Sequence, residues 1–271
     1  MSLAFLGVSD FLYRWGQRWE LHGGPFMLLQ NLAYLPTALV LTYVRSELIW
    51  TIPLLLGLLN GLLAFTGFLF LLMAFKRGQA LALAPVVRLN FAVTAALTIA
   101  LLGEHINLVK AAALLLAALA VIAVGSGASS GGGDRRSFWL AVSAMTIFGF
   151  IGLFYKLAIN HGAPPAAMTL FQSIGVFFIA LPYAVQQRQP LPRGGVPLWL
   201  PFICGGLTAC SYVALAVAMK HGDAVVVAPI SQLSFVLTGL LAVVILKEHL
   251  TARKALGVGF AMLSVLLFAG A

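Results

Sequence analysis

Charged side chains are scarce in this sequence. Asp, Glu, Lys and Arg together make up 8% of its 271 residues, whereas an ordinary soluble domain carries about 25%. Hydrophobic residues account for 62%, and the mean hydropathy is +1.04. Because a water-facing surface needs many polar and charged groups, this composition excludes a soluble protein and indicates a chain embedded in a lipid bilayer.

Acidic residues are the scarcest of the charged groups. The chain has 7 Asp and Glu against 16 Lys and Arg, which gives a formal net charge of +9. The basic residues are scattered singly or in pairs between apolar segments and form no continuous stripe. This pattern argues against nucleic acid as a partner and predicts contact with the anionic headgroups of lipids.

Motifs for catalysis and for ATP binding are absent. Cys204 and Cys210 stand six residues apart in one apolar segment, a spacing that suits neither a redox pair nor a metal site. There is no phosphate-binding Gly-Lys-Ser/Thr loop and no His-Glu-x-x-His motif, and the apolar segments hold no Ser/His/Asp set or paired carboxylates. We therefore expect neither an enzyme nor an ATP-driven pump, and no cofactor or metal.

Long apolar segments dominate what the sequence does contain. A helix that crosses a bilayer needs roughly 20 mainly apolar residues, because lipid cannot hydrogen-bond to the backbone. The N-terminal segment lacks the basic leader and cleavage site of a secretory signal, so we expect it to be a retained helix. We predict an all-α polytopic membrane protein with ten transmembrane helices, at residues 2–20, 26–44, 50–74, 79–102, 107–127, 137–160, 164–186, 196–219, 224–246 and 252–270.

A Gly- and Ser-rich segment at residues 128–136 separates the fifth predicted helix from the sixth. It is too polar to cross a membrane and has the composition of a flexible linker. We therefore predict a first five-helix unit at 1–127, a linker at 128–136 and a second five-helix unit at 137–271.

The two units repeat each other in sequence. The pattern Gly78, Ala84-Pro85, Glu104 recurs as Gly222, Ala228-Pro229, Glu248, at a constant offset of 144 in residue number. Nearer the start of each unit the offset is 142, and it relates Gly7, Tyr13, Arg14 and Gln30 to Gly149, Tyr155, Lys156 and Gln172. Because five helices is an odd number, equivalent helices must enter from opposite faces of the membrane. This predicts two inverted five-helix repeats, an arrangement that supports alternating access.

The doubled Gly, Ala-Pro and Glu pattern and the five-plus-five helices resemble the drug/metabolite transporter superfamily, and specifically its EamA-type members, over essentially the full length. The resemblance implies a basket of helices around a central cavity, with the fifth and tenth helices at the periphery. Members of the superfamily include exporters of amino acids and other metabolites, and organellar relatives that exchange sugar phosphates or nucleotide sugars.

We therefore expect a secondary transporter that moves a small polar or amphipathic metabolite, such as an amino acid or a related compound, including an anionic one. The alternatives are a multidrug or organic-cation exporter, or a channel or structural membrane subunit. The expected partners are the substrate, the lipid bilayer and a proton as coupling ion, in a monomer or homodimer.

The distribution of basic residues and the family resemblance predict opposite orientations of the chain in the membrane. Most Lys and Arg residues follow the odd-numbered helices, and by the positive-inside rule this puts both termini outside. The family resemblance implies cytoplasmic termini in a prokaryotic inner membrane, and we adopt that arrangement as the expectation.

Arg88 is the leading candidate for substrate binding. An ionisable group inside a span is costly, on the order of 3 kcal/mol at the centre of a helix, and usually marks function. Its repeat partner is the neutral Gln232, so the cation is an asymmetric addition to a symmetric scaffold. Arg88 would bind an anionic group, or it would bridge helices through a carbonyl or Asp10. Phe91 and Phe235 follow at helical spacing as candidate walls or core residues.

Asp10 and Arg14 stand four residues apart in the first helix, where they could form an internal ion pair. Asp10 is also the candidate for proton coupling, although a permanently paired carboxylate would not exchange protons.

The remaining candidates are polar or aromatic residues at repeat-related positions. Gln30, Asn31 and Gln172 would bind a polar ligand or hydrogen-bond between helices. Tyr13 and Tyr155 form a repeat pair, and Trp15 is a stacking wall or part of an interfacial belt. Pro85 and Pro229 each free a backbone carbonyl and are candidate hinges or fixed kinks.

Overall fold

The computed structural model describes residues 1–19, 21–77, 80–103, 107–127, 135–192, 194–221, 231–232, 234–247 and 252–270. Within these residues the chain is helical and contains no strand. The first half holds α1 (Ser2–Gly16), α2 (Gly23–Val44), α3 (Leu55–Arg77), α4 (Ala80–Arg88), α5 (Asn90–Leu102) and α6 (Leu108–Gly127). The second half holds α7 (Arg135–Asn160), α8 (Pro165–Gln187), α9 (Val196–His221), α11 (Ser234–Leu246) and α12 (Ala252–Ala269). Short 3₁₀ turns follow α1 and precede α3, at Gln17–Trp19 and Ile52–Leu54.

Every predicted transmembrane segment contains a helix, so the predicted class, an all-α polytopic membrane protein, is confirmed. Six helical segments of the described chain are long and apolar enough to cross a bilayer, and α6, α11 and α12 contain shorter apolar stretches. α7 begins at Arg135, two residues before the predicted start. The fourth predicted helix is divided into α4 and α5 at Leu89, whose ψ of 7° departs from helical geometry one turn after Pro85.

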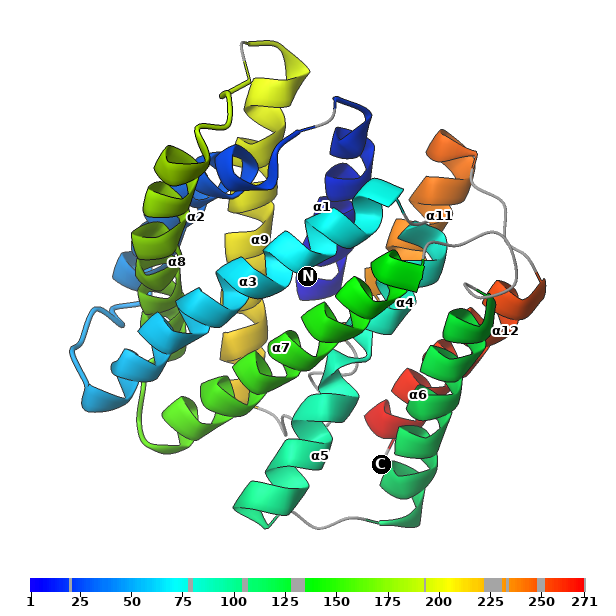
Figure 1. The fold of residues 1–271 in the computed structure, drawn as a ribbon. Helices are drawn as coiled ribbons and strands as arrows, with labels where there is room; N and C mark the ends of the chain where they lie inside the picture. The colour runs from blue at the N-terminus through cyan, green and yellow to red at the C-terminus, as the bar shows by residue number, and fades with distance from the viewer. Residues whose placement is uncertain are drawn as a thin grey trace.

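Equivalent helices of the two halves make equivalent contacts. α3 packs against α7 and α8, and its counterpart α9 packs against α1 and α2. In the same way α5 contacts α7, while α11 contacts α1. Two further pairs join a helix to its own counterpart, namely α2 with α8 and α6 with α12. These two pairs lie on the pseudo-twofold axis of two inverted five-helix repeats, with α6 and α12 at one edge of the bundle (Figure 1).

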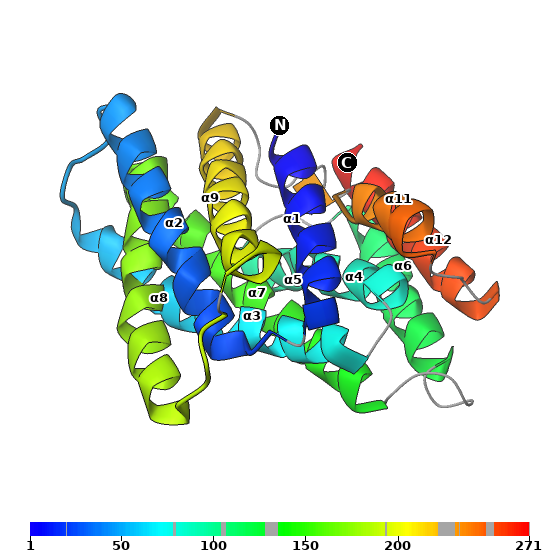
Figure 2. The ribbon, with the colours of Figure 1, turned by 90° about the horizontal axis from the view of Figure 1, so that it is seen from above.

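Both chain ends lie at one end of the bundle, as Figure 2 shows. The opposite end carries the C-terminal ends of α1, α3 and α8 and the start of α7. Exposed basic residues gather there, at Arg18, Lys76, Arg135, Arg136 and Arg188. This end is called the basic end below.

Two glycines bring the halves into close contact at symmetric positions. Gly61 in α3 faces the carbonyl oxygen of Gln172 in α8, and Gly205 in α9 faces the carbonyl oxygen of Gln30 in α2. A methyl group added at either glycine would overlap that oxygen. Close approach of backbones through small residues is a common means of helix association in lipid. The hydrophobic effect does not drive helices together there, because lipid tails are as apolar as the helices.

A second symmetric pair of contacts uses hydroxyl groups. Thr238 in α11 donates a hydrogen bond to the carbonyl oxygen of Gly7 at 3.0 Å, and Thr94 in α5 donates to that of Gly149 at 2.9 Å. The offset of 144 relates Thr94 to Thr238, and the offset of 142 relates Gly7 to Gly149, so both offsets of the sequence repeat are present. The repeat is therefore expressed in individual hydrogen bonds as well as in helix order.

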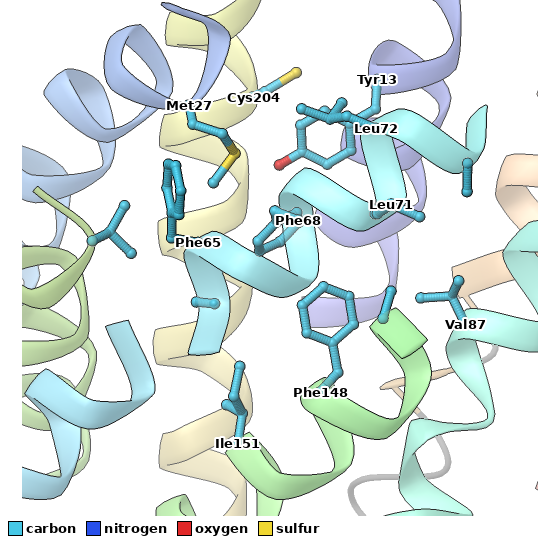
Figure 3. Packing of buried hydrophobic residues seen from close by; sticks show 14 of the residues in the cluster. Tyr13, Met27, Phe65, Phe68, Leu71, Leu72, Val87, Phe148, Ile151 and Cys204 are labelled. Atoms are coloured by element: carbon cyan, nitrogen blue, oxygen red, sulfur yellow. The ribbon is translucent and has the colours of Figure 1, made fainter. Parts of the chain in front are cut away.

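The main core lies between the halves and is rich in aromatic side chains. Phe68 in α3 meets Phe148 in α7 with ring centroids 5.1 Å apart, and Tyr13 in α1 lies 5.7 Å from the ring of Phe68 (Figure 3). Edge-on aromatic pairs of this kind contribute about 0.5–1.5 kcal/mol beyond their buried area. The outer surface is also apolar, for example at Leu115 and Phe178, as a lipid-facing surface must be.

We predict that Gly205→Ala lowers the melting temperature in detergent, whereas Gly206→Ala, one residue away, does not. The methyl group at position 205 would meet backbone on α2, and overpacking of this kind costs about 1–3 kcal/mol or more. A methyl group at Gly206 meets nothing within 4 Å and gains helix propensity of up to about 1 kcal/mol. Equal melting temperatures for the two variants would show that this crossing does not hold the halves together.

Candidate functional site

A central cavity lies between α1, α4, α5, α7 and α9. It offers about 70 Å³ to the centres of water molecules, room for roughly five waters at 10–15 Å³ each. Its lining is mainly apolar with several polar side chains, and consists of Leu6, Arg88, Asn90, Phe91, Thr94, Phe148, Ile151, Gly152, Tyr155, Ser211, Tyr212, Leu215, Ala216 and Gln232. The cavity can accept a small amphipathic solute as it stands.

A buried ion pair lies at the edge of the cavity. Arg88, the last residue of α4, donates from Nε to Oδ2 of Asp10 in α1 at 2.9 Å, and its Nη2 binds the same oxygen. The two side chains are only 8% and 3% exposed. Oδ1 of Asp10 has no hydrogen-bond partner among the described residues. Arg88 lines the cavity and Asp10 lies behind it.

The predicted ion pair between Asp10 and Arg14 is replaced by the pair between Asp10 and Arg88. Arg14 donates from Nη1 to the carbonyl oxygen of Phe75 at 2.9 Å. That carbonyl belongs to the last turn of α3, where backbone acceptors lack helical partners and a cation is favoured. Arg14 therefore joins α1 to α3 at the basic end.

Gln232, the repeat partner of Arg88, also lines the cavity. Its Nε2 donates to the hydroxyl of Ser231 at 3.5 Å, and its Oε1 has no partner among the described residues. A free buried acceptor is costly unless a ligand or water satisfies it. The asymmetry predicted from the sequence, with a cation in one half and a neutral amide in the other, therefore faces one common space.

Two stacked tyrosines form a wall of the cavity. The rings of Tyr155 in α7 and Tyr212 in α9 are 6.4 Å apart and inclined by 19°. The hydroxyl of Tyr155 donates to Oε1 of Gln172 at 2.5 Å and lies 3.2 Å from the hydroxyl of Thr169. The sequence analysis missed Tyr212. Its repeat partner at the offset of 144 is Phe68, so the added hydroxyl is the signal that could have revealed it.

A second, smaller pocket lies on the other side of Tyr212 and brings together Gln30, Asn31 and Gln172. It holds about 20 Å³ for water centres, enough for one or two waters. Asn31 donates to the carbonyl oxygen of its repeat partner Ser173 at 3.0 Å, so this bond crosses the pseudo-twofold axis. Oε1 of Gln30 and the hydroxyl of Tyr34, which the sequence analysis also missed, have no partner in the described structure.

Three of the predicted binding residues lie away from these pockets. The hydroxyl of Tyr13 is 3.2 Å from that of Thr208, and its ring is held in the main core. Phe235 packs in the second core cluster, with α6 and α12. Trp15 stacks edge-on against Trp19 at 4.8 Å. Core packing explains their burial without a ligand.

Of the two candidate hinges, Pro85 and Pro229, the structure describes Pro85. Pro85 is buried inside α4 one turn before the break at Leu89, and its carbonyl oxygen accepts a hydrogen bond from the backbone N–H of Leu89 at 3.2 Å. Pro229, like the Glu104 and Glu248 positions of the repeat pattern, lies outside the described residues.

Comparison with known proteins identifies the family. The model of the EamA-like transporter family matches residues 135–270. The chain belongs to the EamA-like transporter family. A protein of Sinorhizobium sp described as an uncharacterized transporter in the cobO 3′ region is 40% identical over 135 residues, which are 49% of this chain and 94% of that protein. The protein is therefore an integral membrane transporter, and this relative has about the length of one five-helix repeat.

A solved structure shares the fold over almost the whole chain. A protein known from a crystal structure superposes with a TM-score of 0.70, at 16% sequence identity, over 98% of this chain and 96% of the other. At 16% identity, the structural similarity supports the fold and nothing further about function.

We predict that removing either member of the buried pair destabilises the transporter, and that removing both restores stability. Asp10→Asn or Arg88→Gln leaves one uncompensated buried charge, which typically costs about 3–5 kcal/mol. The double variant leaves none. Melting temperatures of the three variants in detergent form a double-mutant cycle. Additive losses in the double variant would show that the two side chains are not coupled.

Proposed function

We propose that this transporter is a secondary carrier that moves a small polar or amphipathic metabolite, such as an amino acid or related compound, by alternating access. The observation that carries the proposal is a buried ion pair at the edge of a mainly apolar cavity. Charged groups within membrane helices are expensive and are characteristic of substrate and ion pathways. Arg88 lines the same cavity as apolar side chains such as Phe91 and Phe148, so an amphipathic solute can contact both kinds of group.

The symmetry of the contacts supports alternating access. Among the described residues, the contacts of α3 with α7 and α8 and of α5 with α7 have inverted counterparts in those of α9 with α1 and α2 and of α11 with α1, so an arrangement that closes one end of the bundle has an equivalent that closes the other. A rocking movement can then expose the central cavity to either face in turn.

Two matching hydrogen bonds at opposite ends of the bundle are suited to act as latches. Oε2 of Glu47, in the connection between α2 and α3, accepts a hydrogen bond from the backbone N–H of Ala166 at the start of α8, at 2.7 Å. Oε1 of Gln189, after α8, accepts one from the backbone N–H of Gly24 at the start of α2, at 3.3 Å. The repeat offset of 142 relates Glu47 to Gln189 and Gly24 to Ala166, so the two bonds are equivalent by symmetry.

The two latches differ in strength. A carboxylate at a helix N-terminus makes a charge-assisted bond and gains from the helix dipole, whereas an amide makes a neutral bond. Glu47 is further held by Arg45 at 3.1 Å. The Gln189 latch, at the basic end, therefore opens more easily. A cleft of about 430 Å³, lined by Trp19, His22, Pro190 and neighbouring residues, lies beside it and would admit the solute.

The proposal also covers the orientation of the transporter in the membrane and its coupling ion. The basic residues of the basic end are exposed in the structure, and we propose on the positive-inside rule that this end faces the cytoplasm of a prokaryotic cell. This reverses the expectation taken from the family. A proton is the proposed coupling ion, with Asp10 as its carrier when the pair with Arg88 opens.

Transport itself is tested with a metabolite panel in proteoliposomes, with and without a proton gradient. We expect uptake of at least one small amphipathic solute, and loss of that uptake in Arg88→Gln while Lys220→Gln, which removes an exposed cation at the end of α9, keeps it. Accumulation driven by the gradient would support proton coupling. No flux of any solute would refute the assignment as a carrier.

The latches are tested by labelling a cysteine placed at Leu215, which lines the cavity, after Cys204 and Cys210 are changed to alanine. We expect Glu47→Gln to increase labelling by an impermeant reagent from the end that holds Glu47. Gln189→Glu should reduce labelling from the basic end. Each change is worth on the order of 1 kcal/mol, or about five-fold in population. Labelling from both sides that is unaffected by the two substitutions would contradict the latch assignment.

A further inference from the structure

The packed core and the central cavity are built from equivalent positions of the two repeats. The core holds a cluster of three rings, in which Phe68 lies 5.7 Å from Tyr13 and 5.1 Å from Phe148 between centroids (Figure 3). The repeat offsets of 142 and 144 relate Tyr13, Phe68 and Phe148 to Tyr155, Tyr212 and Leu6. All three equivalents line the cavity. The same set of positions is therefore packed in one place and faces a space in the other.

The ring cluster and its equivalent lie toward opposite ends of the bundle. Tyr13 is in the last turn of α1 and Phe68 is in the second half of α3, and both helices end at the basic end. Tyr155 and Tyr212 are in the second halves of α7 and α9, which run away from the basic end toward the chain termini (Figure 2). The end that carries the termini is called the terminal end below. The chain is therefore packed toward the basic end and holds its cavity toward the terminal end.

Polar groups are buried beside the packed rings. The hydroxyl of Thr208 in α9 lies 3.0 Å from that of Ser9 and 3.2 Å from that of Tyr13. At the equivalent positions of the other repeat, Ser9 and Thr208 are replaced by Ile151 and Ala64, so the crossing of these helices does not require hydroxyl groups. Polar side chains inside membrane helices usually face a bundle interior or a water-filled path. These hydroxyls suit a surface that water reaches in another arrangement of the helices.

Asp10 belongs to the same packed face. Its repeat partner is Gly152, which lines the cavity, whereas Asp10 is buried behind it. Oδ1 of Asp10 has no hydrogen-bond partner among the described residues, and a buried acceptor of this kind needs a partner from elsewhere. Arg88 and its repeat partner Gln232 both line the cavity. Exchange of the two repeat conformations would therefore keep Arg88 and Gln232 at the cavity and would add Asp10.

We propose that the packed face of Ser9, Asp10, Tyr13 and Phe68 is a second solute-contacting wall, which lines the cavity when the basic end is open. The ring cluster of Tyr13, Phe68 and Phe148 is the gate that closes that end. The inference rests on the alternating access of the proposed function, in which the repeats exchange conformations. It assigns Asp10 to one side of the membrane, because water from the terminal end does not reach it in either arrangement.

Labelling of single cysteines from one side at a time tests this assignment, in vesicles of known orientation and with Cys204 and Cys210 changed to alanine. We expect Ser9→Cys to react with an impermeant thiol reagent from the basic end and not from the terminal end. Leu72→Cys is a second probe of the same wall. Leu72 is buried in the main core, and its repeat partner Ala216 lines the cavity.

Two matched positions provide the controls. Ile151→Cys, the repeat equivalent of Ser9→Cys at the cavity, should be labelled from the terminal end. Ser264 is buried as completely as Ser9 but bonds to the carbonyl oxygen of Ala113 between α12 and α6. Ser264→Cys should react from neither end, which separates opening of the gate from general loosening of the bundle.

Exchanging the third ring between the two sets should move the population of open states. Phe148→Leu removes one aromatic contact from the gate at the basic end. Leu6→Phe builds the equivalent third ring beside Tyr155 and Tyr212, and so favours closure of the terminal end. Each variant should raise the labelling rate of Ser9→Cys from the basic end by about 2- to 12-fold, the range expected for one aromatic pair. The two changes act at different contacts, so either one serves where the other does not fold.

Three results would overturn the inference. They are labelling of Ser9→Cys and Leu72→Cys from neither end, labelling of both from the terminal end, and a rate that neither ring variant changes. Failure of the proposed function is a different outcome, because it appears as no flux of any solute in proteoliposomes. A chain that transports solute while Ser9→Cys and Leu72→Cys stay unlabelled would refute the second wall and leave the carrier assignment intact.

Discussion

The backbone crossings at Gly61 and Gly205 determine how the two halves of this transporter meet. Each glycine faces the carbonyl oxygen of a glutamine in the opposite half, Gln172 or Gln30. The side chains of the same two glutamines line the pocket beside the axis. Packing and polar chemistry are therefore coupled, because the contact that brings the helices together also fixes the position of the amides.

Much of the architecture could be predicted from the sequence because the constraint is strong and local. Lipid requires uninterrupted apolar helices, so the spans are visible in composition, and the two repeat offsets relate positions that form matching contacts. The same logic identified Arg88 and Gln232, which line one cavity. Arg88 and Gln232 were identified because they differ at positions that the repeat makes equivalent. Tyr212 differs from its repeat partner Phe68 in the same way, and the same comparison could have identified it.

What could not be predicted depends on contacts between distant segments. Asp10 and Arg14 satisfy the helical i, i+4 rule, yet Asp10 is paired with Arg88, 78 residues away. Helical spacing shows which partners are possible and does not show which helix packs alongside. Tyr13 and Phe235 illustrate the same limit, since an aromatic side chain in a membrane helix looks alike whether it faces a cavity or the core. The linker and domain boundaries stay a prediction, because residues 128–134 lie outside the described part.

Symmetry and asymmetry have separate roles in this molecule. A symmetric scaffold makes the two end states similar in structure, which alternating access requires. A fully symmetric site would bind any ligand in two equivalent, opposed orientations. The pair of Asp10 and Arg88, both in the first half, removes that equivalence, and the unequal bonds of Glu47 and Gln189 do the same for the two ends. In the proposed mechanism, a small number of polar differences between the repeats is thus sufficient to give an inverted duplicate a preferred substrate orientation and a preferred open face.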